Sequence, residues 1–146
     1  MLGCLEDNNL VETGINKNDR FTPLASTELA VHRAIYKQTS ASAIVHAHPA
    51  YAVALSFVER EIIPCDVEGN LLFLKVPVLG WGMTVKSGEL AEEIAESLTQ
   101  YKIVVVHGHG SFAIGQLLEE AYHYTTALEE SCRLLYLLKA LQANPG

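Results

Sequence analysis

The chain has 146 residues, an apolar fraction of 49% and a formal net charge of −7, which predicts one globular domain over residues 1–146 with a buried core. Its ten basic residues are spread along the chain without a basic stripe, so a nucleic-acid partner is not expected. No apolar run approaches the roughly 20 residues of a membrane span, and the first residues lack the pattern of a signal peptide. We therefore expect a soluble, cytoplasmic protein without membrane contact, whose three cysteines are reduced.

The first part of the chain predicts loops followed by helices and a strand. Residues 1–22 are polar and turn-rich, with at most one short strand around residues 10–12. Apolar residues recur at helical spacing over residues 26–38, which predicts a helix. The stretch "AIVHAHP" at residues 43–49 is typical of a short strand that ends before a proline. A second apolar helix is predicted over residues 50–58.

The remainder predicts further strands and two more helices. Residues 61–80 contain two prolines and two glycines between short apolar pieces, which indicates one or two strands joined by turns. Residues 87–101 form an amphipathic pattern that predicts a helix, and residues 102–115 predict a strand, a glycine-containing turn and a return strand. A long helix is predicted over residues 117–141. Its expected buried side comprises Leu117, Ala121, Leu128, Cys132, Leu135 and Leu138.

The alternation of helices and strands defines the expected fold class. The strand "IVVV" at residues 103–106 is apolar on both faces, and such a strand requires a sheet that helices cover on both sides. We therefore expect an α/β protein, a three-layer α/β/α sandwich.

Two histidines at the end of the first strand raise the question of function. His46 and His48 are two residues apart, and side chains alternate along a strand, so both imidazoles are expected on the same face. Two adjacent imidazoles do not both stay protonated near neutral pH without compensation. This pair alone is as compatible with a hydrogen-bonded structural pair as with a metal site.

The stretch "VHGHGS" at residues 106–111 repeats this arrangement. His107 and His109 are again two residues apart at the end of an apolar strand, so four of the six histidines form two HxH pairs. Strand ends and the loops after them are where α/β folds gather their sites. Two pairs that converge could supply the three neutral imidazoles of a catalytic zinc site, which leaves one coordination position open for substrate. The repetition therefore favours a metal site.

Four stretches carry a resemblance to the class II aldolase/adducin family. The combination of these stretches at these separations is specific, whereas an HxH pair alone also occurs in unrelated metal-binding folds. The resemblance covers about residues 1–140 and implies that the central sheet is mainly antiparallel. The stretches are "STELAVHRAIYKQ", "AIVHAHPAYAVALS", "VVVHGHGSFAIG" and "EEAYHYTTALEESCRLLYLL".

The resemblance also implies roles for individual residues. His46 and His48 match the first two metal ligands, and His109 matches the third, with His107 as the alternative. Glu28 matches the acidic residue that serves as catalytic acid or base in the aldolases. Without the resemblance, a glutamate in a first helical turn would be interpreted as a charge that interacts favourably with the helix dipole. That interaction stabilises a helix by only about 0.3–1 kcal/mol. Ser26 and Thr27 match small hydroxylated positions that help to bind the substrate phosphate.

These roles imply a zinc-dependent aldehyde-lyase. Each chain would bind one Zn²⁺ or another first-row divalent metal. It would cleave a sugar phosphate, a ketose 1-phosphate, by a retro-aldol reaction through a metal-stabilised enediolate, because a divalent metal stabilises that charge as a Lewis acid. The alternatives are a sugar-phosphate epimerase or dehydratase on the same scaffold, and a non-catalytic interaction module similar to the adducin head. The resemblance further implies a homotetramer.

The start of the chain departs from the family pattern. Family members carry an additional N-terminal segment that supplies most of the phosphate-binding groups, and "MLGCLEDNNLVE" resembles the middle of a typical member. We therefore expect a domain that is truncated at its N-terminus relative to the family. Its metal site would persist while phosphate binding is weakened.

Overall fold

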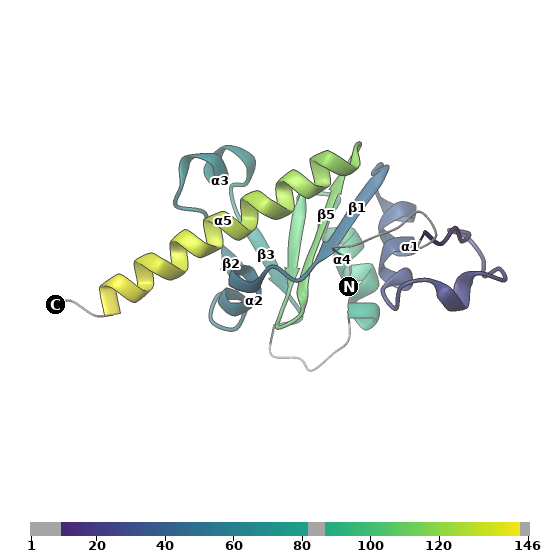
Figure 1. The fold of residues 1–146 in the computed structure, drawn as a ribbon, viewed down its shortest axis with the longest axis horizontal. Helices are drawn as coiled ribbons and strands as arrows, with labels where there is room; N and C mark the ends of the chain where they lie inside the picture. The colour runs from purple at the N-terminus through teal and green to yellow at the C-terminus, as the bar shows by residue number, and fades with distance from the viewer. Residues whose placement is uncertain (1–9, 82–86, 144–146) are drawn as a thin grey trace.

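The fold is built on one five-stranded sheet in the order β1-β5-β4-β3-β2 (Figure 1). We analysed a computed structural model, which describes residues 10–81 and 87–143. β3 and β4 run parallel, and the other three neighbouring pairs are antiparallel, so the expected mainly antiparallel sheet is confirmed. The strands are β1 (Ala43–Ala47), β2 (Glu61–Ile62), β3 (Val76–Leu79), β4 (Ile103–Val106) and β5 (Gly110–Gly115).

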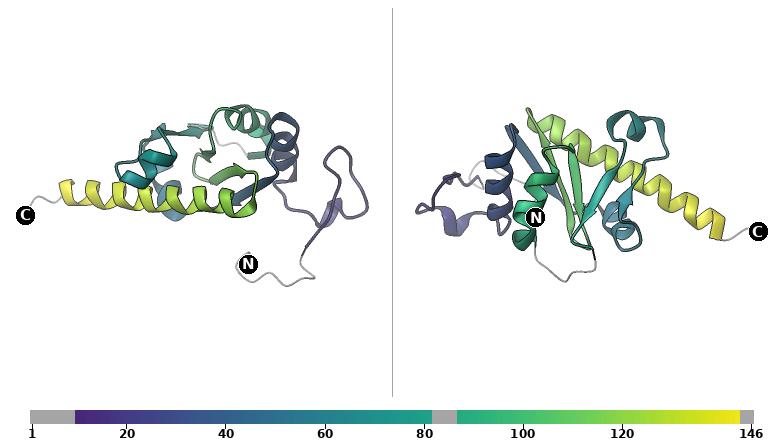
Figure 2. Two further views of the ribbon diagram at one scale, coloured as in Figure 1. Left: turned by 90° about the horizontal axis from the view of Figure 1, so that it is seen from above. Right: turned by 180° about the vertical axis from the view of Figure 1, so that it is seen from behind.

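Helices cover both faces of this sheet (Figures 1 and 2). Over residues 10–81 and 87–143, no helix is both long enough and apolar enough to span a membrane. The α-helices are α1 (Leu29–Gln38), α2 (Ala50–Ser56), α3 (Val67–Leu72), α4 (Ala91–Ser97) and α5 (Leu118–Ala143). Two short 3₁₀ helices, η2 (Thr22–Leu24) and η3 (Ser87–Leu90), complete the described elements.

The apolar strand β4 explains why the molecule has three layers. All four residues of β4 are buried, and their side chains alternate between the two faces of the sheet. Ile103 and Val105 join the core that contains residues of α2 and α5, whereas Val104 and Val106 join the core that contains residues of α1 and α4. The predicted α/β/α sandwich is therefore confirmed.

Two local predictions were wrong, and one predicted helix is confirmed with a later start. Residues 67–72, expected in strands or turns, form α3, because the Asp66 carboxylate caps this helix by accepting the Gly69 N–H at 2.7 Å. Residues 10–12, suggested as a short strand, form no strand. The predicted helix over residues 26–38 begins only at Leu29.

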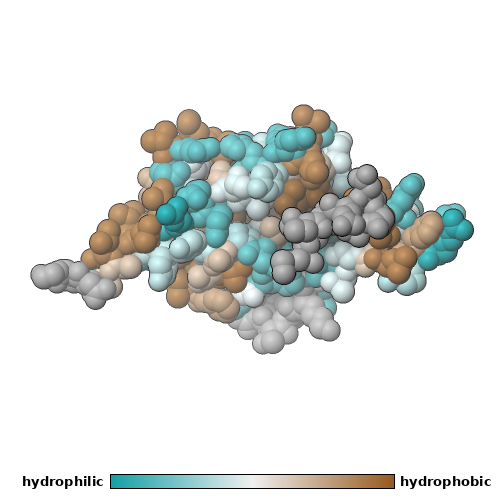
Figure 3. Space-filling model, in the orientation of Figure 1, coloured by the Kyte–Doolittle hydropathy of each residue, from teal (hydrophilic) through white to brown (hydrophobic). Residues whose placement is uncertain are grey.

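The long helix α5 packs only in part as its sequence predicts. Ala121, Leu128 and Cys132 are buried, and Leu135 is partly buried against the same core. Leu117, which directly precedes the helix, and Leu138 are 65% and 45% exposed. The C-terminal end of α5 extends past the sheet (Figure 1). Apolar side chains consequently reach the surface near the C-terminal end of α5 (Figure 3).

Candidate metal centre

His46 and His48 meet where β1 ends. His46 lies within the strand and His48 immediately follows it, before Pro49 at the N-cap of α2. The two Nε2 atoms are 3.1 Å apart. The structure thus bears out the expectation that this HxH pair presents both imidazoles to one point.

The turn between β4 and β5 adds a third imidazole. Gly108 has φ +64°, in the left-handed region that suits glycine in a three-residue hairpin turn, and its N–H donates to the Ser56 hydroxyl at 2.9 Å. This turn directs His109 toward β1, where its Nε2 lies 3.3 Å from the Nε2 of His46. We call His46, His48 and His109 the histidine triad.

His107 does not belong to the triad. Its ring makes edge-on contacts with Phe57 and Trp81, at centroid distances of 5.2 and 5.0 Å. Within the described residues, the one group of histidine, cysteine or acidic side chains arranged to hold a metal ion is the triad, whose ligand atoms lie within 4.8 Å of one another. Of the two candidates for a third ligand, geometry therefore favours His109.

The hydrogen bonds of His46 fix which of its nitrogens is free. Its Nδ1 lies 2.9 Å from the carbonyl oxygen of Ser111. A carbonyl only accepts, so Nδ1 must carry the proton, and in the neutral ring Nε2 then offers its lone pair. Burial, chiefly, and the neighbouring imidazoles of His48 and His109 lower the pKa of His46 to about 4. This ring is therefore neutral at physiological pH, as a metal ligand must be.

Phe112 and Gly110 support the triad from β5. Phe112 is fully buried and stacks on His46 with 4.2 Å between ring centroids and 17° between ring planes. The two residues face each other across β1 and β5. A Cβ atom added at Gly110 would lie 2.6 Å from Cδ2 of His48 and would also collide with the carbonyl oxygen of Ala47. Glycine at this position therefore lets β1 and His48 approach β5.

Glu28 places a carboxylate beside the triad. It occupies the N-cap position of α1, and the Ser26 hydroxyl accepts its N–H at 3.2 Å. Its side chain is only 13% exposed, and Oε1 lies 3.9 Å from Nε2 of His109. One turn later in α1, burial lowers the pKa of His32, whereas the Glu28 carboxylate raises it. The structure thus brings Glu28 and the triad together.

Ser26 and Thr27 lie beside this centre, at the start of α1. Both are exposed, and Ser26 lines a cavity that also contains His46. Thr27 directly precedes Glu28 in the chain, and the structure adds nothing further about its expected role.

The chemistry of the donor set fits a metal ion. Zinc bonds of 2.0–2.1 Å in tetrahedral geometry require neighbouring ligand nitrogens about 3.3 Å apart. The two separations from Nε2 of His46, 3.1 and 3.3 Å, are close to that value. Three imidazoles with a nearby carboxylate are typical of a catalytic rather than a structural zinc site, because a fourth position stays open.

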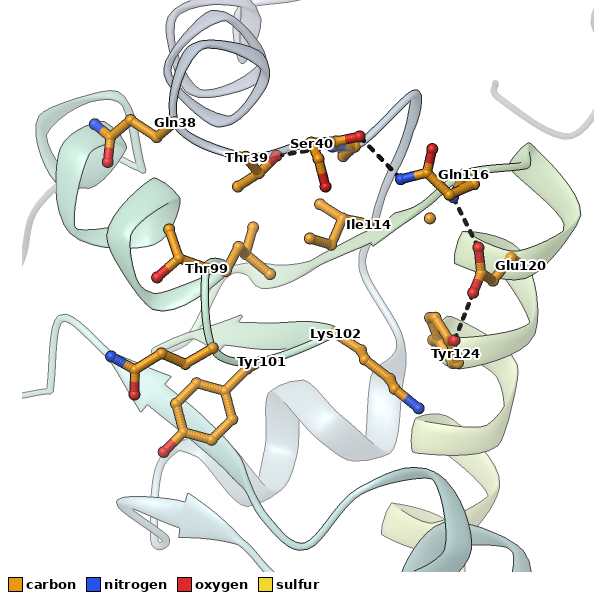
Figure 4. A pocket seen from close by; sticks show the side chains of 14 residues that line it. Gln38, Thr39, Ser40, Thr99, Tyr101, Lys102, Ile114, Gln116, Glu120 and Tyr124 are labelled. Carbon is orange, nitrogen blue, oxygen red and sulfur yellow. Dashed lines mark hydrogen bonds between the residues drawn. The ribbon is translucent and has the colours of Figure 1, made fainter.

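A second hollow, at the opposite end of the sheet, contains none of these residues. It has a volume of about 430 Å³, and Figure 4 shows Thr39, Ser40 and Gln116 along its wall. Its Glu120 carboxylate already accepts the Gln116 N–H and the Tyr124 hydroxyl. Neither the triad nor Glu28 lines this hollow, so the candidate metal centre lies elsewhere.

The family of the chain follows from comparison with known proteins. A sequence model of the family described as "Class II Aldolase and Adducin N-terminal domain" matches residues 1–136. The chain belongs to this family. The resemblance noted in the sequence is thereby confirmed.

Proteins similar to this chain include enzymes with two activities. It is 29% identical over 118 residues to an L-fuculose phosphate aldolase of Methanococcus maripaludis, a match that covers 80% of this chain and 64% of that protein. It is 30% identical over 119 residues to a 3-oxo-tetronate 4-phosphate decarboxylase of Pectobacterium atrosepticum, covering 77% of this chain and 54% of that protein. The chain therefore spans less than two thirds of the length of either relative.

A solved structure supports the fold. The crystal structure of an L-fuculose-1-phosphate aldolase from Thermus thermophilus matches with a TM-score of 0.85 at 37% identity. The match covers 95% of this chain and 73% of that chain. The class II aldolase architecture expected from the sequence is therefore confirmed.

Phe112 and the Ser111 carbonyl are the parts of the site that the sequence analysis missed. Both follow directly after the "HGHG" motif in the chain. Their contact with His46 depends on the pairing of His46 with Phe112 across β1 and β5. The alternation of side chains within one strand does not identify which residue of another strand lies opposite.

Proposed function

We propose that this chain is a zinc-dependent class II aldolase-like lyase that cleaves a ketose 1-phosphate by a retro-aldol reaction. The observation that carries the proposal is the convergence of three imidazole nitrogens within 4.8 Å, with the Glu28 carboxylate 3.9 Å from His109. Other first-row divalent ions also bind imidazole ligands. A cytoplasmic homotetramer is part of the same proposal and rests on the family resemblance.

Each member of the triad would have the same task, to hold the cation through Nε2. When bound, the cation would act as a Lewis acid that stabilises negative charge on the substrate oxygens as the carbon–carbon bond breaks. The Nδ1–H of His46 would stay on the Ser111 carbonyl, which keeps the ring in the required tautomer.

Glu28 is proposed as the group that moves the proton. Retro-aldol cleavage removes the proton of the hydroxyl group on the carbon that becomes the aldehyde, and the carbon that is left with the electron pair must then be protonated. A carboxylate can accept the first proton and return one, provided that it lies close to both atoms. Glu28 is mostly buried beside the triad, which supports this role.

Ser26 and Thr27 are proposed to bind the substrate phosphate through their hydroxyl groups. The nearby cation Arg33 is already engaged, because its guanidinium donates to the carbonyl oxygens of Gly14 and Lys17 at 2.6–3.1 Å. Among the described residues that share a cavity with Ser26, phosphate binding would therefore depend on neutral donors. We expect a high KM for this chain on that ground.

Substitution of Glu28 tests the proposed reaction. Glu28→Gln should keep its zinc and lose cleavage of a ketose 1-phosphate by at least about a hundredfold in kcat, the lower end of what general acid–base catalysis contributes. Zinc content and aldehyde release are measured on the same preparation. Glu93→Gln, an exposed glutamate on α4, is the matched control and should behave as the wild type. Unchanged turnover in Glu28→Gln would remove Glu28 from the mechanism.

Two alternatives give different results in the same assay. An epimerase or a dehydratase would convert a sugar phosphate without releasing an aldehyde, and a module related to adducin would turn over no sugar phosphate. The presence of the complete triad together with Glu28 favours the enzyme over the module. Product analysis with zinc-loaded protein separates the three outcomes.

A further inference from the structure

The short helix α2 joins the two chain segments that carry the triad. It begins at Ala50, two residues after His48. Its last residue, Ser56, contacts the turn between β4 and β5, because the Gly108 N–H donates to the Ser56 hydroxyl at 2.9 Å. His109 is the next residue of that turn. Each end of α2 is therefore adjacent to one ligand of the candidate metal centre.

Ser56 holds this turn from the C-terminal end of α2. Its side chain is fully buried. The hydroxyl donates to the Val53 carbonyl oxygen at 2.6 Å and accepts the Gly108 N–H. Phe57 packs on the same turn, since a Cβ atom added at Gly108 would lie 3.0 Å from Cζ of Phe57. The hydroxyl thereby ties the backbone directly before His109 to α2.

Glu129 of α5 holds the N-terminal end of α2. Both carboxylate oxygens accept the Tyr51 N–H at 3.0 Å, and Oε2 also accepts the Ala52 N–H at 3.1 Å. The first N–H groups of a helix have no partner within the helix, and a negative charge beside them is favourable. Glu129 and Tyr51 are 78 residues apart in the sequence, so this contact fixes α2 to α5 close to His48.

The support that α2 gives to the triad differs from the support of His46. A hydrogen bond to the Ser111 carbonyl orients the His46 ring itself. For His48 and His109, the contacts at the ends of α2 act on the backbone near each ligand. Zinc–nitrogen bonds of about 2.0–2.1 Å leave little tolerance in the positions of the ligand nitrogens. A shift of α2 would therefore change how His48 and His109 meet at one ion.

From these contacts we propose that Glu129 and Ser56 are positioning residues of the metal centre, which act through α2 to set the position of His48 relative to His109. This inference rests on the proposed function, because it requires the triad to bind a metal ion. Neither side chain belongs to the triad. Substitution of residues that orient metal ligands from outside the ligand set typically weakens metal binding by about 10–100-fold.

Zinc affinity tests both assignments. Glu129→Gln keeps the size of the side chain but replaces one acceptor oxygen beside the Tyr51 N–H with an amide group that only donates. Ser56→Ala removes the acceptor of the Gly108 N–H. Each substitution should raise the dissociation constant for zinc at least about tenfold, measured by competition with a chelating dye on folded protein. An unchanged constant in either variant would overturn the proposal.

Two matched controls separate positioning from a general loss of stability. Glu120→Gln alters another glutamate of α5, which accepts the Gln116 N–H at the opposite end of the sheet. Ser131→Ala alters a serine that is as buried as Ser56 but packs against Gly69 of α3. Both controls should bind zinc like the wild type, and controls that lose as much affinity as the test variants would refute the positioning role. A wild type that binds no zinc would instead refute the metal centre itself, and this proposal with it.

Cobalt(II) provides a readout that a change in stability alone does not move. Cobalt can replace zinc at imidazole sites, and its visible absorption depends on the geometry of its ligands. Glu129→Gln and Ser56→Ala, saturated with cobalt, should differ from the wild type in the intensity of their visible bands. Glu120→Gln and Ser131→Ala should reproduce the wild-type spectrum. Spectra of the two test variants that match the wild type would contradict a role in positioning the ligands.

Discussion

The imidazole of His46 shows how one side chain is prepared by its surroundings. The Ser111 carbonyl accepts its Nδ1–H, Phe112 stacks on one face, and Nε2 points toward His48 and His109. A ring held in this way loses little freedom when it binds a metal. Such preorganisation is typical of a functional rather than an incidental histidine.

The lowered pKa of His46 predicts how the stability of the metal-free protein depends on pH. In the folded state the pKa of this imidazole is about 4, mainly because of burial, whereas its ordinary value is 6.5, and burial shifts the pKa of His32 in the same direction. Below pH 6.5 the unfolded chain binds protons that the folded chain does not. The free energy of unfolding should therefore fall as the pH is lowered from 6.5 toward 4. Urea denaturation across this range measures it, and a constant or rising stability would contradict the prediction.

Gly110 predicts a steric test of the centre. In Gly110→Ala the new methyl group would collide with Ala47 and His48, so β1 must shift relative to β5. We expect a loss of about 1–3 kcal/mol in the free energy of unfolding, as for other overpacked sites, together with weaker zinc binding. Gly88→Ala is the control, because a Cβ there has no neighbour within 4 Å. Equal effects of the two substitutions on denaturation and zinc titration would argue against close contact at Gly110.

At the scale of elements, the sequence correctly predicts those helices and strands whose residue pattern fits only one type of secondary structure. The strand β4 is apolar at every position and buried at every position, and the two HxH motifs mark the ends of β1 and β4. α3 was missed because Pro64 and Gly69 suggested turns. Gly69 instead permits close packing, since a Cβ there would meet Ser131 and Pro64. A glycine in a sequence does not reveal whether it serves a turn or a contact.

The long helix α5 illustrates a second limit at this scale. Its C-terminal half carries leucines on more than one side, and Leu134, Leu137, Leu138 and Leu141 are all more than 40% exposed. Helical periodicity identifies apolar faces, but it does not tell which face meets the sheet. Where the helix leaves the sheet, no face is buried against it.

At the scale of the whole molecule, the three layers bring together sites that are distant in the chain. Glu28 opens α1 on one face of the sheet, and the triad comes from the end of β1 and from the turn between β4 and β5. Sequence spacing predicted that two histidine pairs lie at strand ends. It could not predict that the order β1-β5-β4 joins these ends, because strand order depends on pairing between remote segments. The assignment of His109 as the third metal ligand therefore came from the family resemblance and not from the strand order.

The central claim is that the histidine triad binds one metal ion, and metal analysis after purification without chelators tests it most directly. The wild type should retain about one zinc per chain. His48→Ala should lose it while remaining folded, because His48 is exposed. His107 lies outside the triad, although it belongs to the same HxH motif as His109. His107→Ala should therefore retain zinc like the wild type. A wild type without zinc, or a His48→Ala variant that keeps full occupancy, would contradict the account.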